Sequence, residues 1–358
     1  MNITGNRGEW SEAYTLLRLL ADGKLFAADE QLNKIEDMFF PIIKIIREET
    51  IGSRYDYATN EENAEIEIYL NDEPVLRVLA KTFDDEANKL LDEISRGKGK
   101  GAFEIPRAEA FIRSIYVEKL KAKSANKSDI NIQIHDINTG FEKVVGFSIK
   151  SDLGSPPTLL NAGETTNFIY KVEKLDPRQI PVINSIDTDR KIKDRITAIN
   201  DCGGKLVFHG MQNTTFNENL IMIDSQMPMV IAEMLVGYYS GAATKCQELA
   251  KYVIDSNPLR QSENFYRHNI KELLCAVALG MKPATSWDGT DEATGGYIIV
   301  KTNGDVVAYH IYNRDSFRNY LLNNTKFESA GSTKHKYAEL YEQDDDIFIK
   351  LNLQIRFS

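Results

Sequence analysis

Residues 128–151 contain two runs of alternating apolar and polar side chains around a short turn, and this pattern restricts the fold more than any other stretch of the chain. In SDINIQIHDINTGFEKVVGFSIKS the apolar positions are Ile130, Ile132 and Ile134 in the first run and Val145, Phe147 and Ile149 in the second. Successive side chains of a strand point to opposite faces of its sheet. The pattern therefore predicts an antiparallel hairpin with one apolar face and one polar face.

The polar face of this hairpin carries an unusual set of side chains. It consists of Asp129, Asn131, Gln133 and His135 on the first strand and Gly146, Ser148 and Lys150 on the second. With Thr139 and Gly140 at the centre of the turn, Asp129 lies opposite Lys150. A pairing shifted by two residues keeps every side chain on its face, whereas a shift of one buries the lysine.

An aspartate that opens one strand and a lysine near the end of its partner suit phosphodiester hydrolysis if both face a cleft. The carboxylate of Asp129 offers oxygen to a hard cation such as Mg²⁺, and Lys150 positions or deprotonates water and offsets charge in the transition state. The alternative is a cross-strand ion pair on a solvated sheet face, which contributes only ~0.2–1 kcal/mol. His135 lies nearer the turn, where a surface or phosphate-contacting role is expected, and Asp136 is expected to be structural.

Composition narrows the class of protein. A chain of 358 residues with 42% hydrophobic residues is long enough for two lobes, and its net charge of −10 argues against a general nucleic-acid coat protein. We find no apolar run of transmembrane length and no secretory signal pattern, so a soluble cytoplasmic protein is expected. Cys202, Cys246 and Cys275 lack zinc-site spacing and are interpreted as reduced core residues.

Periodicity and turn residues predict an α/β fold with a mixed sheet. A helix is expected from the capping pattern of Asn6 and Glu9 to Gly23. Hairpins are expected at 65–83, through an Asn-Asp turn, and at 295–312, through Asn303-Gly304. Further helices are expected at 84–97, 106–123 and 155–163, through much of 180–280 and at 314–324, and further strands at 41–50, 166–175 and 347–357.

The hairpin resembles the Asp, strand, turn, strand, (Asp/Glu)-x-Lys core of the PD-(D/E)xK nucleases, with Ser148 where the acidic residue normally falls. Together with GNRGEWSEAY, FSIKSDLGSPPTLLNAGETTNF and IKLNLQIRF, it makes the whole chain similar to the HpaII-type family of type II restriction endonucleases. The resemblance implies a restriction-endonuclease-like core flanked by helices in residues 1–178. Residues 179–358 would then form a helical region and a C-terminal, strand-rich α+β region that recognises DNA.

Serine at position 148 leaves a carboxylate of the metal site unassigned. Several restriction enzymes with serine or threonine there use a glutamate from a helix further along the chain, and Glu164 follows Lys150 at such a distance. Glu12 is the rival, because it shares a helix stripe with leucines and is out of place there unless it faces a metal. The predicted catalytic set is Asp129, Lys150, Ser148, Glu12 and Glu164, with Asp129, Glu12 and Glu164 as metal ligands.

Two C-terminal segments are predicted to contact DNA. The terminal strand presents polar side chains of types that bind purine edges or phosphates, and residues 325–337 are expected to form a basic flexible loop. The predicted contacts are Lys326, Ser332, Thr333, Lys334 and His335 in the loop and Lys350, Asn352, Gln354 and Arg356 on the strand. A solvated edge strand is the alternative for the latter. A basic stretch at 107–127 either follows the phosphate backbone or forms a solvated helix face.

The resemblance implies Mg²⁺-dependent cleavage of double-stranded DNA at a short palindrome, CCGG. A homodimer would match a palindrome, although a monomer that nicks each strand in turn is the alternative. A companion DNA methyltransferase would protect host sites without binding the enzyme. Two other classes are considered: a GIY-YIG-like nuclease, suggested by GGYIIV, and a non-catalytic DNA-binding protein.

Overall fold

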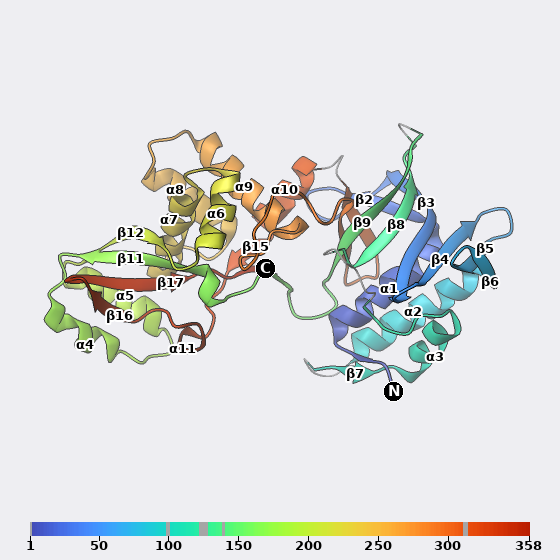
Figure 1. Ribbon diagram of the computed structural model, residues 1–358, viewed down its shortest axis with the longest axis horizontal. Helices are drawn as coiled ribbons and strands as arrows, with labels where there is room; N and C mark the ends of the chain where they lie inside the picture. The colour runs from blue at the N-terminus through green and yellow to red at the C-terminus, as the bar shows by residue number, and fades with distance from the viewer. Residues whose placement is uncertain (1, 98–100, 122–127, 138–139, 311–313) are drawn as a thin grey trace. The chain divides into compact units, whose positions relative to one another are not determined.

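The computed structural model describes residues 2–97, 101–121, 128–137, 140–310 and 314–358. The chain forms two compact units (Figure 1). Unit 1 comprises Met1–Pro157 and Asp291–Phe317, and unit 2 comprises Thr158–Thr290 and Arg318–Ser358. Unit 1 therefore contains the hairpin with Asp129 and Lys150, and it is built from two separate stretches of sequence.

Unit 1 is organised around a nine-stranded mixed sheet with the order β2-β14-β13-β9-β8-β3-β4-β5-β6. Its strands are β2 (Lys24–Ala28), β3 (Lys34–Thr50), β4 (Ser53–Asn60), β5 (Glu65–Leu70), β6 (Glu73–Leu79), β8 (Ile130–His135), β9 (Glu142–Ser151), β13 (Gly296–Val300) and β14 (Val306–His310). The β13–β9 and β14–β2 pairs are parallel, and the other pairs are antiparallel. β3 pairs with β2 through its first half and with β4 and β8 through its second half, so the sheet curls back on itself.

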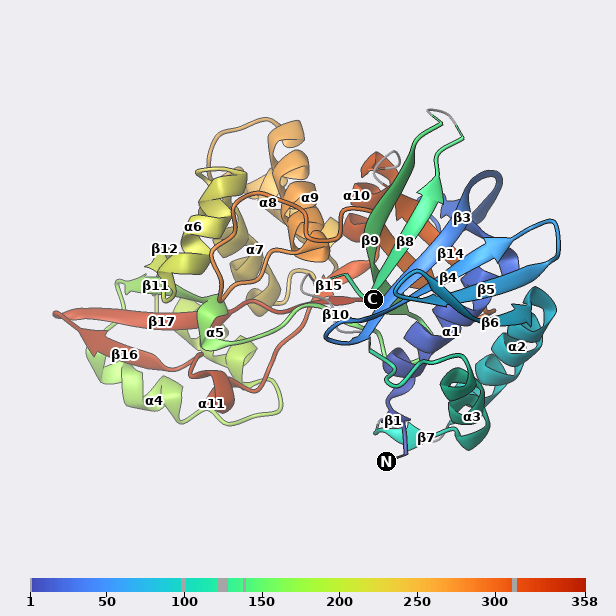
Figure 2. The same ribbon diagram turned by 45° about the vertical axis from the view of Figure 1, so that its right-hand side comes forward.

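Helices cover the apolar face of this sheet (Figure 2). They are α1 (Arg7–Asp22), α2 (Ala80–Arg96) and α3 (Pro106–Ser114), and a small pair of strands, β1 (Thr4–Gly5) and β7 (Phe103–Glu104), lies beside them. The buried leucines of α1 pack in one core with Ile132 and Phe147 of the hairpin. Burial of this apolar surface, at roughly 25 cal/mol per Å², fixes the helices on the sheet.

Unit 2 contains two smaller sheets and most of the helices. The four-stranded sheet has the order β12-β11-β17-β16, and the three-stranded sheet has the order β10-β18-β15. The strands are β10 (Thr158–Leu160), β11 (Asn167–Glu173), β12 (Lys205–Met211), β15 (Thr325–Phe327), β16 (Leu340–Gln343), β17 (Asp346–Asn352) and β18 (Ile355–Phe357). The helices are α4 (Ile180–Asn184), α5 (Lys191–Asp201), α6 (Thr214–Ile223), α7 (Met227–Ser240), α8 (Cys246–Ser256), α9 (Glu263–Leu279), α10 (Arg314–Asn323), which begins in unit 1, and α11 (Ser332–His335).

Helix α7 anchors the core of unit 2. Nine of its fourteen residues are buried. Tyr170 of β11 donates a hydrogen bond to the carbonyl of Ala232 at 2.8 Å, and Tyr239 donates one to the carbonyl of Asn352 at 2.9 Å. These two bonds attach α7 to neighbouring strands of the four-stranded sheet.

Most predicted elements of unit 1 are confirmed. Asn6 and Glu9 form the expected capping box, and α1 ends where Gly23 adopts a left-handed φ of 61°. The Asn71-Asp72 turn joins β5 to β6 with positive φ at both residues, as a two-residue hairpin turn requires. The hairpin through Asn303-Gly304 joins β13 to β14. Thr139, placed by the sequence at the centre of the other turn, lies outside the described residues.

Several predicted elements are wrong. The segment at 155–163 contains the strand β10 rather than a helix, and the helix predicted over 106–123 ends at Ser114. Tyr116 has a φ of 66° and stacks on Tyr55, and Tyr57 donates to the carbonyl of Ile115. These contacts of the sheet with residues 115–116 outweigh the helical periodicity of the sequence. The last two residues of the predicted helix, 122–123, lie outside the described residues.

The C-terminal strand and one cysteine also differ from expectation. The predicted strand at 347–357 is divided between β17 and β18, which belong to different sheets. The three cysteines are free, but only Cys246 and Cys275 are buried, and Cys202 is exposed near the end of α5. The unit boundary at Pro157 and the return of Asp291–Phe317 to unit 1 also differ from the expected division at residue 178.

Among the described residues, no single helix is long and apolar enough to cross a membrane. One bent pair, α6 with α7, passes the same criteria of length and composition at an angle of 106°.

Candidate active site

Asp129 immediately precedes β8, and its backbone and its carboxylate both form hydrogen bonds with β9. Its backbone N–H donates to the carbonyl of Phe147 at 2.8 Å. Its Oδ2 accepts hydrogen bonds from the Ile149 N–H at 2.7 Å and from the Ser148 hydroxyl at 3.1 Å. The carboxylate is therefore fixed in orientation, and its other oxygen is not committed to these two bonds.

The register of the hairpin differs from the predicted one by two residues. Asn131 pairs with Gly146 and Ile130 pairs with Phe147, so Asp129 lies beside Ser148 rather than opposite Lys150. The predicted faces are preserved, because a two-residue shift keeps side-chain parity. Gly146 favours this pairing, since a Cβ there would lie 2.6 Å from the Cβ of Ser128.

Lys150 is half-buried near the end of β9. Its Nζ lies 5.8 Å from the ring centroid of Tyr297, a fully buried residue of the adjacent strand β13. In the part of the chain that the structure describes, no carboxylate lies within 4.0 Å of this ammonium group. The cross-strand ion pair between Asp129 and Lys150, the alternative interpretation of the sequence, is therefore absent between these two described residues.

Helix α1 brings Glu12 to the same site. Glu12 is half-buried and lies one turn before Leu16 on the helix face that packs into the core. Its neighbour Ser11 is fully buried and donates a hydrogen bond to the Ser151 hydroxyl of β9 at 2.8 Å. This contact holds the first turns of α1 against the strand that carries Lys150.

The pKa of Glu12 is raised from 4.5 to about 8. Burial is the largest cause, and repulsion by the Asp129 carboxylate adds to it. Lys121, Arg47 and Lys150 lower the pKa and partly offset these effects. Asp129, Lys150 and Glu12 thus lie within electrostatic range of one another, which is the grouping that the sequence predicted for one of its two candidate glutamates.

Two neighbouring carboxylates at a partly buried site suit a hard divalent cation, which prefers oxygen ligands. The described residues contain no group of three or more His, Cys, Asp or Glu side chains arranged to hold a metal ion. A cation at this site would therefore be held by Glu12 and Asp129, with backbone oxygen or water completing its coordination, as is common for Mg²⁺.

Glu164 belongs to unit 2 and has partners there. It opens a single 3-10 turn, Glu164–Thr166, and its carboxylate lies 2.9 Å from the Nζ of Lys336 and 3.4 Å from the Nε2 of Gln212. The hydrogen bond from Lys336 is the main reason why its pKa is lowered. Glu12, and not Glu164, lies with Asp129 and Lys150 in unit 1.

The predicted DNA-contacting residues all lie in unit 2. Residues 325–337 are not an unstructured loop, because they include β15 and α11. Thr333, Lys334 and Lys336 are exposed, whereas Lys326, Ser332 and His335 are half-buried.

Lys350 of β17, Arg356 of β18 and Gln354 between them are half-buried. Arg356 forms an ion pair with Glu328 at 2.8 Å. The expectation that Asn352 points outward is wrong. Asn352 is 1% exposed and donates hydrogen bonds to the Gly163 carbonyl at 2.7 Å and to the Asn167 side chain at 2.7 Å.

Sequence reasoning missed two residues close to the site. Arg47 and Glu49 of β3 form an ion pair at 2.8 Å on the apolar side of the sheet, where they are only 4% and 2% exposed. Arg47 donates to the carbonyl of Lys119 at 2.8 Å, and Glu49 accepts from the N–H of Glu118 at 3.0 Å. The run PIIKIIREET does not alternate regularly, so the sequence does not show that these two charges face the interior.

Comparisons with known proteins identify the family of the chain. The family model for the HpaII restriction endonuclease matches residues 6–357. The type II restriction enzyme HpaII of Haemophilus parainfluenzae is 42% identical over 360 residues, which cover 99% of this chain and 99% of that enzyme. No solved structure matches the chain significantly. We conclude that the chain belongs to the HpaII restriction endonuclease family.

Proposed function

We propose that this protein is a type II restriction endonuclease that hydrolyses both strands of double-stranded DNA at a short palindromic site, with CCGG as that site. The single observation that carries the activity is the full-length match to the HpaII family, with 42% identity to a named type II restriction enzyme. This match sets aside the GIY-YIG-like nuclease and the non-catalytic DNA-binding protein. The expected place of action is the cytoplasm, where a companion methyltransferase would protect the host sites.

The catalytic centre is assigned to Glu12, Asp129, Ser148 and Lys150, in a core of the PD-(D/E)xK type. Glu12 and Asp129 would hold a divalent cation, with Mg²⁺ as the expected ion, which supplies positive charge beside the scissile phosphate. Asp129 is held for this task by the Ile149 N–H and the Ser148 hydroxyl. The carbonyl of Ile149, the residue whose N–H holds the Asp129 carboxylate, is the proposed further ligand.

Lys150 is assigned to the attacking water and to the transition state. Its ammonium group has no carboxylate within 4.0 Å in the described chain, so its charge is not neutralised by a neighbour. At this position it can orient or deprotonate a water molecule and stabilise the negative charge that develops on the phosphate. Ser148 occupies the place of the usual acidic residue and acts by orienting Asp129, which leaves Glu12 as the second carboxylate.

Lys150→Ala tests this assignment. Because Lys150 acts on the transition state, we expect the variant to bind a CCGG duplex as the unaltered protein does and to cleave it more slowly by a factor of about 10²–10⁴. The matched control is Lys143→Ala, an exposed lysine on the same strand, which should cleave normally. Plasmid digestion with Mg²⁺, followed by sequencing of the fragment ends, measures both the rate and the site.

The possible failures of this test are separable. Full cleavage by Lys150→Ala refutes the assigned catalytic centre without refuting the activity. Fragment ends at a sequence other than CCGG refute the proposed site alone. If the unaltered protein leaves DNA intact, the proposed function itself is refuted. A palindromic site also suits a two-fold dimer, and sedimentation of the protein with a duplex would determine the number of copies bound.

A further inference from the structure

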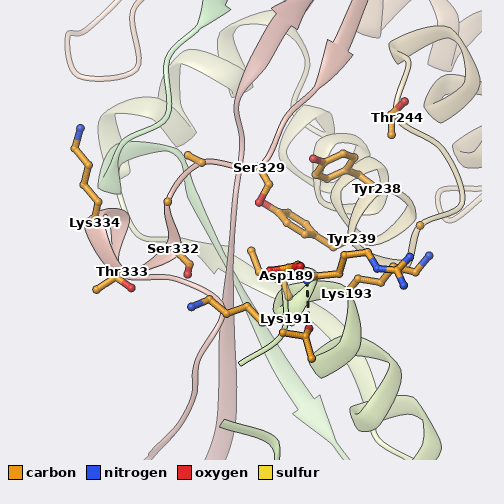
Figure 3. Close-up of a pocket in the computed structure, with 16 residues that line it drawn as sticks. Asp189, Lys191, Lys193, Tyr238, Tyr239, Thr244, Ser329, Ser332, Thr333 and Lys334 are labelled. Atoms are coloured by element: carbon orange, nitrogen blue, oxygen red, sulfur yellow. Dashed lines mark hydrogen bonds between the residues drawn. The ribbon is translucent and has the colours of Figure 1, made fainter. Parts of the chain in front are cut away.

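Unit 2 contains a cavity of about 720 Å³ that the catalytic assignment does not use (Figure 3). Three segments line it: residues 188–193 at the start of α5, residues 238–244 at the end of α7, and residues 329–334 at the start of α11. All of them belong to unit 2. Sequence reasoning had marked the last segment as DNA-contacting, but it had no signal that residues 188–193 lie against it.

The cavity is lined by four basic side chains and one acidic side chain, in a protein whose net charge is −10. The basic residues are Arg190, Lys191, Lys193 and Lys334, and the acidic residue is Asp189. In the described part of the chain, Arg190, Lys193 and Lys334 have no carboxylate within 4.0 Å. Three of the four basic side chains at this cavity are therefore not neutralised by an ion pair with any described residue.

Local structure holds this charge in place. The Thr188 hydroxyl donates to the Asp194 carboxylate at 2.5 Å and accepts from the Arg190 N–H at 3.2 Å, which fixes the chain where α5 begins. Gly241 ends α7 with a φ of 82°, and the end of the Lys193 side chain lies close to the position that a Cβ would take there. Figure 3 shows Lys191 pointing toward the segment that carries Ser332 and Thr333.

Lys191 is the basic residue with a partner. Its Nζ lies 3.1 Å from the Asp187 carboxylate, whose side chain is 82% exposed. Exposed pairs of this kind contribute about 0–1 kcal/mol, so an incoming anion can replace Asp187 at little cost.

We infer that this cavity binds the phosphodiester backbone of the DNA substrate and positions it, without reading its bases. The inference rests on the proposed function, since it assigns to that function a surface for its substrate. Unpaired basic side chains together with the hydroxyls of Ser332 and Thr333 match phosphate oxygens, which accept most protein–DNA hydrogen bonds. The cavity is larger than a lone phosphate needs and is in the range of sites that enclose a drug-sized ligand.

The net charge of −10 is a further reason to expect a local basic surface. A strongly acidic protein repels DNA at long range, and a local positive region offsets that repulsion and raises the association rate. Neutralised phosphates release counterions, so each contact adds about −0.9 to the slope of log K against log salt concentration. This slope distinguishes a backbone contact from a contact with a base.

The test compares Arg190→Ala/Lys193→Ala with Lys205→Ala/Lys251→Ala, a control pair that removes two exposed lysines of unit 2 away from the cavity. Binding to a CCGG duplex and to an unrelated duplex is measured without Mg²⁺ over a range of salt concentrations. For the cavity variant we expect the slope to fall by about 1–2 and the affinity to fall by the same factor, ten-fold or more, on both duplexes.

The other outcomes overturn the inference. Equal slopes in the variant and the unaltered protein would show that no phosphate is bound there, and a loss confined to the CCGG duplex would show that bases are read. A thermal shift with inorganic phosphate at constant ionic strength is the second arm. Stabilisation that disappears in the variant, together with unchanged DNA binding, would assign the cavity to a free phosphate instead. If the unaltered protein binds no DNA, the proposed function fails first.

Discussion

At the scale of single residues, Glu12 shows how a helix stripe accommodates a carboxylate. The residue occupies a position that the packing of α1 would fill with an apolar side chain, and burial beside Asp129 raises its pKa to about 8. Ionisation of a carboxyl group with so high a pKa lowers the stability of the folded protein. If Glu12 is a ligand of the proposed cation, the bound cation would remove that cost.

Glu12→Gln should reveal this cost through the pH dependence of stability. The folded pKa of about 8 exceeds the ordinary value of 4.5, so the stabilising effect of the proton is complete below pH 4.5 and is lost as the pH rises to 8. Without metal, we expect the variant to unfold like the unaltered protein at pH 4.5 and to be more stable at pH 8.5. The change in pKa sets an upper limit of about 5 kcal/mol on the difference, which solvent screening of the half-buried side chain lowers. Urea unfolding in a chelator measures this.

The same variant should lose cleavage, and Mg²⁺ should stabilise the unaltered protein but not Glu12→Gln. A stability difference that is the same at both pH values would contradict the buried, protonated Glu12. The matched control is Glu9→Gln, since Glu9 lies on the same helix and its role is to cap it.

At the scale of elements, β3 both pairs with its neighbouring strands and carries a buried ion pair that contacts the segment after α3. Its Arg47–Glu49 ion pair faces the interior, and both residues hydrogen-bond to the backbone at 118–119, after the end of α3. These bonds hold in place the segment that carries Lys121, one of the cations near Glu12. Because α3 ends at Ser114, the backbone at 118–119 is free of the helix and can form these bonds with β3.

Glu49→Gln should be strongly destabilising, because it leaves the Arg47 guanidinium buried without its countercharge. We expect a loss of about 3–5 kcal/mol in the free energy of unfolding. Glu36→Gln is the control: Glu36 pairs with Lys34 at 3.0 Å on the same strand, but its side chain is 73% exposed, so its loss should cost less than about 1 kcal/mol. Equal effects of the two substitutions in urea unfolding would contradict a structural role for the buried pair.

At the scale of the whole molecule, unit 1 is assembled from two distant parts of the chain. β13 and β14 lie between β9 and β2 in the nine-stranded sheet, although more than a hundred residues of unit 2 separate them from β9 in sequence. Every residue of β13 is buried. A fragment that ends near residue 178 therefore lacks strands from the middle of its own sheet.

Residues 1–178 expressed alone should fail to fold cooperatively, since the fragment exposes the edge of β9 and the core positions that β13 covers. Joining residues 291–317 to residue 157 through a flexible linker should restore a single cooperative transition in urea. Circular dichroism and urea unfolding of the two fragments measure this. A cooperative transition in the 1–178 fragment would refute the view that β13 and β14 are required.

The sequence by itself determined the local features of this protein. Alternation specified the two faces of the 128–151 hairpin, and the capping box and Gly23 specified the limits of α1, because these patterns act over a few neighbouring residues. The family was recognisable for the same reason, since its motifs are continuous stretches of chain.

Only the tertiary structure decided which distant segments meet. Two hairpin registers preserve the faces, and only the structure shows which of them is formed. The structure also shows that Asn352 is buried, and that Arg190 and Lys193 line the same cavity as Ser332 and Thr333. It also placed Glu12, and not Glu164, in the unit of Asp129 and Lys150. Periodicity says which side of an element is buried, whereas the partner on that side is selected by packing between segments that no local pattern connects.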